Sequence, residues 1–254
     1  MTGEENTTNE VLLQIQGLYK SFGGLMAVCN VNLTVYEGHI FSVIGTNGAG
    51  KTTLFNLVTG YLPSDLGTVI FKGRDITKAS IHEISHRGIG RAFQVSQIFP
   101  GLTVFENVQS AVLVRQAVGT RSFSHYAKQG IEETSRYLDH VKLSEHSKRI
   151  SSTLSRGDQK RLDIAIALAG GAELLLLDEP TAGMSPEETS GISDLIQLLP
   201  RDLNVSVLFT EHDIDVVFAC AQRIAVMDGG IVIAEGTPEE IRGNTDVQRI
   251  YMGA

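Results

Sequence analysis

Eight consecutive residues between two hydrophobic segments have the composition of a loop that binds phosphate. They are Gly45, Thr46, Asn47, Gly48, Ala49, Gly50, Lys51 and Thr52, and they fit the pattern G-x-x-x-x-G-K-[ST]. Glycines in such a loop permit backbone angles that direct successive N–H groups inward, and the positive end of the next helix also attracts an anion. The lysine of this pattern reaches the β- and γ-phosphates of a nucleotide, and the following hydroxyl ligates Mg²⁺. We therefore predict that this loop and the adjacent Thr53 bind ATP, with a catalytic contribution from Lys51.

Two adjacent acids, Asp178 and Glu179, follow a run of four leucines at 174–177. Ligands in open α/β sheets bind beyond the carboxyl ends of the strands, where both acids are expected. Because adjacent side chains of an extended chain point in opposite directions, the two acids should have different functions. We predict that Asp178 joins the Mg²⁺ ligands and that Glu179 polarises the water that attacks the γ-phosphate. Two solvated acids at a strand end are the alternative for this pair taken alone.

Two further side chains are candidates on weaker grounds. His212 follows another predicted central strand, at 205–210, although a single histidine is more often structural or merely exposed. Gln94 follows the short run Arg-Ala-Phe, and its side-chain oxygen suits Mg²⁺ or the attacking water. A functional role for either residue is supported mainly by the presence of the phosphate loop and the acid pair in the same chain.

The composition is that of a globular protein without a general attraction for nucleic acid. The chain has 254 residues, of which 42% are hydrophobic, and this is enough to form a large core. A formal net charge of −8 gives no basic surface, so any phosphate must be held by local geometry. Cys29 and Cys220 match neither a metal pair nor a disulfide framework. The most apolar stretch, 164–177, is interrupted by two glycines and a glutamate and is too short to cross a bilayer.

The elements that must position these residues alternate between strand and helix, which predicts a parallel sheet covered on both faces. The apolar run 40–44 leads directly into the phosphate loop and then a helix. Helices are predicted at 155–169 and 186–199, on either side of the leucine run. Two short strands around Asp228-Gly229-Gly230 predict an antiparallel hairpin.

The domain organisation is predicted to be simple. Residues 1–10 lack the basic and apolar regions of a signal peptide and are expected to form a polar tail. Residues 11–254 are expected to form a single domain. Within it, helical spacing predominates from about 95 to 165, and we predict a helical subdomain there.

The order of these motifs resembles that of ATP-binding cassette ATPases, and in particular the ATPase subunits of branched-chain amino acid importers. The resemblance covers residues 12–252. In it Gln94 in RAFQ is the Q-loop glutamine, LLLLDEP carries the magnesium aspartate and the catalytic glutamate, and His212 in TEHD is the switch histidine. LSRGDQ, at 154–159, is the signature motif, and Phe22 falls where the family stacks an aromatic ring on adenine.

The resemblance implies a P-loop NTPase fold of the cassette type, an α/β domain with a mixed sheet core, an antiparallel β edge and a helical subdomain. It implies ATP and Mg²⁺ as cofactors and a homodimer, or a heterodimer with a related ATPase subunit. It implies that this chain binds peripherally at the cytoplasmic face of the cell membrane. The further partners implied are integral-membrane permeases and a solute-binding protein that acts through them. Residues 95–102, with Ile98, Phe99 and Leu102, would contact a permease; burial within their own domain suits them equally.

In this family the signature serves the ATP held by the opposite subunit. Ser155 precedes a helical run, so its hydroxyl and the Gly157 N–H are expected to present an anion site, although an ordinary serine N-cap has the same geometry. Arg156 stands where many members have Gly, and Asp158 where most have Gln. Asp158 would lie close to phosphate, which is unfavourable unless Arg156 or solvent screens its charge. In the D-loop, at 182–185, Ser185 replaces the usual Asp.

Other functions stay open on the sequence alone. Relatives of this form also serve urea, amide, aromatic-acid or lipid transport. A soluble cassette ATPase that acts on DNA or ribosomes is a second possibility, but such proteins usually have a second cassette, a coiled-coil insertion or basic arms. A third is a scaffold that binds nucleotide without hydrolysing it, for which the departures at Asp158 and Ser185 are the best support.

Overall fold

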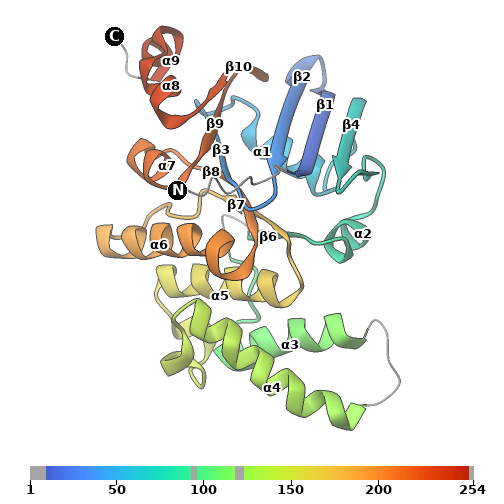
Figure 1. Ribbon diagram of the computed structural model, residues 1–254, viewed down its shortest axis with the longest axis vertical. Helices are drawn as coiled ribbons and strands as arrows, with labels where there is room; N and C mark the ends of the chain where they lie inside the picture. The colour runs from blue at the N-terminus through green and yellow to red at the C-terminus, as the bar shows by residue number, and fades with distance from the viewer. Residues whose placement is uncertain (1–9, 93–95, 118–122, 252–254) are drawn as a thin grey trace, which may run out of the picture.

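The computed structural model describes residues 10–92, 96–117 and 123–251. Its centre is a six-stranded sheet in the order β10-β9-β3-β8-β7-β6 (Figure 1). Neighbouring strands are parallel except for β9 and β10, which form the predicted antiparallel hairpin. The strands are β3 (Ile40–Gly45), β6 (Ile89–Ala92), β7 (Leu174–Asp178), β8 (Ser206–Thr210), β9 (Arg223–Asp228) and β10 (Ile231–Gly236).

A second, antiparallel sheet has four strands in the order β2-β1-β4-β5. They are β1 (Val11–Phe22), β2 (Leu25–Tyr36), β4 (Leu66–Phe71) and β5 (Arg74–Asp75). β1 and β2 form a long hairpin that places Phe22 at its turn. The antiparallel part is therefore a separate sheet in addition to the β9–β10 hairpin at the edge of the central sheet.

Helices cover the central sheet and extend beyond it. They are α1 (Lys51–Val58), α2 (Ile81–His86), α3 (Val104–Ala117), α4 (Phe123–His140), α5 (Arg156–Ala169), α6 (Pro186–Leu203), α7 (Ile214–Cys220), α8 (Pro238–Gly243) and α9 (Thr245–Tyr251), with two 3-10 turns, η1 (Ser144–His146) and η2 (Ser151–Thr153). In Figure 1, α3, α4 and α5 lie together at the end of the molecule away from the antiparallel sheet. Their division into a separate subdomain stays a prediction.

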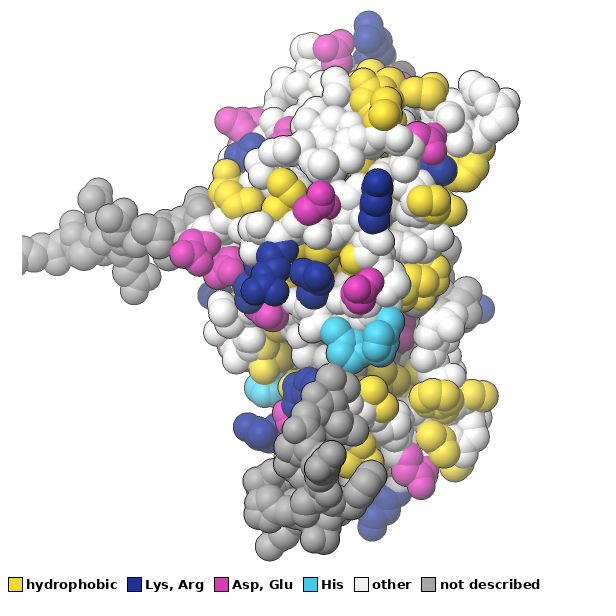
Figure 2. Space-filling view, turned by 90° about the vertical axis from the view of Figure 1, so that its right-hand side faces the viewer, with side chains coloured by type: hydrophobic (Ala, Val, Ile, Leu, Met, Phe, Trp, Pro, Cys, Tyr) yellow, Lys and Arg dark blue, Asp and Glu magenta, His cyan; other side chains and the backbone are white. Residues whose placement is uncertain are grey.

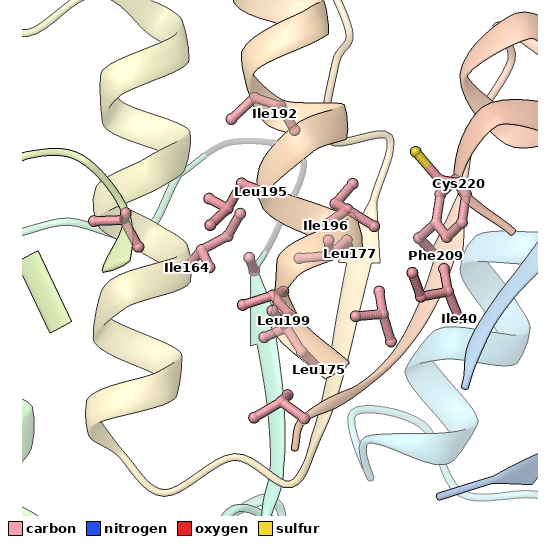
Figure 3. Packing of buried hydrophobic residues seen from close by; sticks show 14 of the residues in the cluster. Ile40, Ile164, Leu175, Leu177, Ile192, Leu195, Ile196, Leu199, Phe209 and Cys220 are labelled. Atoms are coloured by element: carbon pink, nitrogen blue, oxygen red, sulfur yellow. The ribbon is translucent and has the colours of Figure 1, made fainter. Parts of the chain in front are cut away.

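The run of four leucines is buried on both faces of the sheet because alternate side chains enter different cores. Leu175 and Leu177 belong to a cluster that includes residues of α5, α6 and α7, while Leu174 and Leu176 join a cluster with α1 and the antiparallel sheet. Figure 3 shows the first cluster, with Leu175 and Leu177 near side chains of α6 and Phe209 beside Cys220 of α7. Burial on both faces explains a continuous apolar run in place of alternation.

Two predicted helices have caps that fix their starts. α5 begins after Ser155, whose Oγ accepts a hydrogen bond from the Asp158 N–H. α6 begins at Pro186 and continues to Leu203, one turn beyond the predicted end, through Pro200.

Among the described residues, no helix has the length and hydropathy needed to cross a bilayer. Both cysteines are free.

Replacing Phe209 should destabilise the protein because its ring is fully buried in the cluster that β8 shares with α6 and α7. We expect Phe209→Ala to lower the free energy of unfolding by about 3–5 kcal/mol, since the lost contacts and the cavity both contribute. Urea denaturation followed by circular dichroism measures it. The control is Leu66→Ala on β4, where the side chain is 65% exposed and we expect a change within about 0.5 kcal/mol. Equal effects of the two substitutions would contradict the described core.

Candidate nucleotide site

The phosphate loop joins the end of β3 to the start of α1, as predicted, and its glycines are required by backbone angle or by close packing. Gly48 and Gly50 have φ angles of 83° and 100°, in the left-handed region that favours glycine. A Cβ on Gly50 would lie 2.2 Å from the carbonyl oxygen of Ala27, and one on Gly45 would lie 2.4 Å from that of Met227. The loop is therefore held against the backbones of β2 and β9, and a side chain at either position would push it away.

Lys51 lies under this loop with its side chain buried. Its Nζ donates hydrogen bonds to the carbonyl oxygens of Gly45 at 2.6 Å and Thr46 at 3.1 Å. Burial lowers the pKa of Lys51 by disfavouring the charged form, while the nearby carboxylates of Glu179 and Asp178 act in the opposite direction. The ammonium group is thus positioned between the loop and the acid pair.

Asp178 ends β7 and is held by two neighbouring elements. Its Oδ1 accepts a hydrogen bond from Thr210 Oγ1 at 2.9 Å, and its Oδ2 forms an ion pair with Arg91 Nη2 at 3.0 Å. Arg91 also donates to Asn56 Oδ1 at 2.6 Å and to Thr59 Oγ1 at 3.3 Å, both on the α1 side of the site. The buried carboxylate is therefore fixed to β8, to β6 and, through the guanidinium, to α1.

Glu179 differs in backbone conformation from Asp178, which is the last residue of strand β7. Its φ is 45°, which is uncommon for a residue with a side chain, and its N–H donates to the Thr210 carbonyl at 3.1 Å. Its Oε1 lies 2.7 Å from Nε2 of His212. Strained backbone of this kind concentrates at functional sites, where the surrounding structure maintains it. The structure thus brings together the predicted glutamate and histidine.

Glu211, which precedes His212, is a buried acid that fixes the local backbone. Its Oε1 accepts hydrogen bonds from the N–H and the hydroxyl of Thr181, at 2.8 Å and 2.6 Å, and its Oε2 accepts from the His212 N–H at 2.9 Å. This carboxylate joins the segment after β7 to the segment after β8. Glu179 begins the first of these segments and His212 lies in the second, so Glu211 helps to hold the two residues in position relative to each other.

One pocket of about 430 Å³ connects the phosphate loop to Glu179 and to the β1–β2 turn, and Asp178 is not among the residues that line it. The predicted residues that line it are Phe22, Asn47, Gly48, Ala49, Gly50, Lys51, Thr52, Thr53 and Glu179. Phe22 is 45% exposed, and Lys20 Nζ lies 5.6 Å from its ring centroid. Gly45 and Thr46 support the loop through their carbonyl contacts with Lys51. Gln94 lies outside the described residues.

The four signature residues lie elsewhere, at the N-terminus of α5. Among the described residues that line the pocket, none belongs to 155–158. The Gly157 N–H donates to Glu188 Oε1 at 3.1 Å, and Asp158 Oδ2 lies 3.8 Å from His146 Nε2. Asp158 occupies the first turn of α5, where the helix dipole favours a negative charge. Within the described part of the chain, the imidazole of His146 is the basic group recorded at ion-pair distance from Asp158, and screening by Arg156 or solvent stays a prediction.

Ser185 performs the capping function that an aspartate has at such a position. It is the N-cap of α6, and its Oγ accepts a hydrogen bond from the Glu188 N–H at 3.3 Å. Serine and aspartate are among the strongest N-cap residues, so the replacement preserves the local helix start.

The family model described as "ABC transporter" matches residues 28–182 of this chain. The chain belongs to the ATP-binding cassette family of ABC transporters. It is an ATPase subunit of this family and binds nucleotide. A second family model, "Branched-chain amino acid ATP-binding cassette transporter", matches residues 232–254 of this ABC ATPase.

Curated relatives of this ABC ATPase match it over nearly their full length. The high-affinity branched-chain amino acid transport ATP-binding protein LivG of Escherichia coli K12 is 39% identical, and the match covers 96% of this chain and 99% of LivG. BraF of Pseudomonas aeruginosa, named for the same transport, is 38% identical over 95% of this chain and 98% of its own length. The lipopolysaccharide export ATP-binding protein LptB of Escherichia coli K12 is 35% identical, with 95% and 97% covered.

Solved structures of ATP-binding cassettes have the same fold. An ABC transporter cassette in its ADP conformation is 31% identical and superimposes with a TM-score of 0.83, covering 96% of this ABC ATPase and 99% of that chain. A dimeric cassette in a post-hydrolysis state bound to ADP and Pi is 26% identical, with a TM-score of 0.77, and the match covers 89% and 99%. The predicted fold class is confirmed.

Sequence reasoning missed three residues that position the site: Arg91, Thr210 and Glu211. Each lies next to a predicted site residue along the chain or at a strand end, but its partners are far away in sequence. The available signal for Arg91 was an arginine in the short apolar run before Gln94. Thr210 and Glu211 immediately precede His212 at the end of a central strand, where ligands gather.

Removing Arg91 should destabilise the chain because Asp178 would lose its buried cation. We expect Arg91→Met to cost about 3–5 kcal/mol of folding free energy, as when one member of a buried ion pair is removed. The double variant Arg91→Met/Asp178→Asn should regain much of this loss because the buried charge is also gone. Urea denaturation without nucleotide measures both. A loss below about 1 kcal/mol in the single variant would show that the pair does not matter for folding.

Proposed function

We propose that this chain binds MgATP in the pocket between Phe22 and Glu179 and hydrolyses it as one of two cassettes that power import of branched-chain amino acids. The observation that carries the proposal is the pocket itself, which joins the N–H groups of the phosphate loop to the Glu179–His212 pair. A phosphate loop supplies binding, and a carboxylate within the same pocket supplies hydrolysis.

The residues divide into groups that hold different parts of the nucleotide. The exposed ring of Phe22 offers a stacking surface for adenine, and the loop amides with the Lys51 ammonium hold the phosphates. Thr52, Gln94 and Asp178 would hold Mg²⁺, and their oxygen atoms are the ligands this ion prefers. Asp178 fits that role because Thr210 and Arg91 already fix its orientation. Bound Mg²⁺ would neutralise charge on the phosphate oxygens.

Hydrolysis requires a base and a group that orients it. Glu179 accepts the proton of the water that attacks the γ-phosphorus. His212, whose Nε2 lies 2.7 Å from Glu179 Oε1, holds that carboxylate and stabilises charge on the phosphate oxygens. Lys51 stabilises the charge that develops between the β- and γ-phosphates.

Two cassettes complete each site in this proposal. Ser155, Arg156, Gly157 and Asp158 lie at the N-terminus of α5, away from the pocket of their own chain, and serve the ATP of an opposite subunit. The likeness to a dimeric cassette bound to ADP and Pi supports this arrangement. The second subunit is another copy or a related ATPase.

Membrane permeases are the proposed transport partners, with the chain bound peripherally at the cytoplasmic face and a solute-binding protein acting through the permeases. Phe99 and Leu102 are 58% and 37% exposed, which suits contact with a permease, whereas Ile98 packs against the core of its own chain. Val95 lies outside the described residues. On the face in Figure 2 acidic and basic side chains are interspersed, and the formal net charge of −8 gives the chain no general attraction for nucleic acid.

The cargo is proposed from the relatives. LivG and BraF are named for branched-chain amino acid transport, and the C-terminal family match carries the same description. The likeness to LptB, at 35% identity, favours a lipid as the second candidate. Affinity purification of the chain from host membranes, with identification of the attached permeases, distinguishes them. We expect amino acid permeases and loss of leucine uptake on gene deletion; permeases of a lipid exporter would overturn the amino acid assignment.

Glu179→Gln tests the catalytic assignment. We expect ATP turnover to fall by about 10²- to 10⁴-fold because the general base is removed, while nucleotide affinity stays close to that of the parent chain. Phosphate release and titration with a fluorescent nucleotide measure the two quantities. Turnover near that of the parent would refute the role of Glu179, and absence of nucleotide binding by the parent chain would refute the pocket.

A further inference from the structure

The anion site expected at the start of α5 is already filled by a carboxylate of the same chain. The N–H of Gly157, the second residue of α5, donates to Glu188 Oε1 at 3.1 Å. Gly157 is buried, and a Cβ placed on it would lie 3.0 Å from Glu188 Cγ. Glu188 thus covers a backbone donor that the proposed function assigns to the phosphate of an opposite subunit.

Glu188 uses its two oxygens for two different helices. Oε2 accepts a hydrogen bond from the Ser185 N–H at 3.1 Å and completes the capping box of α6, while Oε1 faces α5. Its pKa is lowered by the N–H groups of Ser185 and Gly157 and then by the Ser155 hydroxyl. The side chain of Glu188 is therefore an ionised carboxylate held between the positive N-terminal ends of α5 and α6.

A carboxylate and a phosphate cannot both occupy these donors. The Gly157 N–H has one hydrogen to donate, and two anions at the same helix terminus repel each other in a partly desolvated interface. Glu188 is only half-buried, so its side chain can turn toward solvent when the donor is taken. Some of the free energy of ATP binding between two subunits is then used to displace Glu188.

We propose that Glu188 is a positioning residue that occupies the signature donors of the open subunit and gives them up to the γ-phosphate of ATP bound by the opposite subunit. The inference rests on the proposed two-cassette function and adds to it a residue that weakens closure. Glu188 keeps Ser155 and Gly157 in place for phosphate and opposes the nucleotide-driven dimer until phosphate displaces it.

The test measures ATP-dependent dimerisation in chains that carry Glu179→Gln, so that slow hydrolysis lets the dimer accumulate. Glu188→Gln is added because glutamine keeps the side-chain volume and the capping box but removes the charge. The matched control is Glu187→Gln, which removes an equal charge from the same first turn of α6. Analytical ultracentrifugation with MgATP gives the dimer dissociation constant, for the chain alone and for its mixture with any related ATPase subunit that co-purifies.

We expect Glu188→Gln to tighten the MgATP dimer by about tenfold, with less than a twofold change for Glu187→Gln. Nucleotide affinity of the isolated subunit should stay within about twofold in both, because Glu188 contacts α5 and not the phosphate loop. A residue with only a structural role would weaken the dimer when replaced, so a gain is diagnostic.

Two results would overturn the inference and can be told apart. A dimer that is equally tight or weaker in Glu188→Gln, when the parent does dimerise, would refute the role of Glu188 and leave the two-cassette function standing. Failure of every variant to dimerise, alone or with the co-purified subunit, despite measurable MgATP binding, would refute the two-cassette function and with it the phosphate for which Glu188 is proposed to compete.

Discussion

Backbone pairing of β3, β8 and β7 determines where the chemistry of this chain takes place. Asp178 pairs with Thr210, and Thr210 pairs with Val43, two residues before Gly45 at the end of β3. Because the three strands are parallel, their carboxyl ends lie at one level of the sheet, and the phosphate loop, the acid pair and the segment to His212 all begin there. Without that register, residues separated by more than a hundred positions would not share a pocket.

Several buried charged side chains lie near the same edge of the sheet. Their burial costs desolvation free energy, which interactions with the surrounding structure offset. Lys51, Asp178, Glu211 and Lys160 are all at least nine-tenths buried. Burial lowers the pKa of both lysines, and carboxylates at this edge oppose the shift. Asp178 and Glu211 each accept more than one hydrogen bond, which is how charge is tolerated in a protein interior.

The N-termini of three helices, α1, α5 and α6, also determine where anionic groups can bind. The phosphate loop precedes α1 without a side-chain cap, so its amides stay available to a ligand. α5 and α6 are capped by Ser155 and Ser185, and the carboxylate of Glu188 joins their two starts. The departure at Ser185 therefore keeps the capping chemistry, and Asp158 benefits from the dipole of α5.

The sequence by itself determined the phosphate loop, the strand that ends in Asp178 and Glu179, the parallel arrangement and the helices at 155–169 and 186–199. These depend on local composition and spacing, which a linear sequence displays directly. It did not reveal β4, β5 or α2, which are short and lack strong periodicity, and it placed the end of α6 one turn too early because a proline inside a helix usually ends it. Only the tertiary structure decided that Arg91 pairs with Asp178, that His146 lies beside Asp158 and that Glu188 covers Gly157. Each of these contacts joins residues of different elements, 12 to 87 positions apart along the chain, and depends on how whole elements pack, which no local pattern encodes.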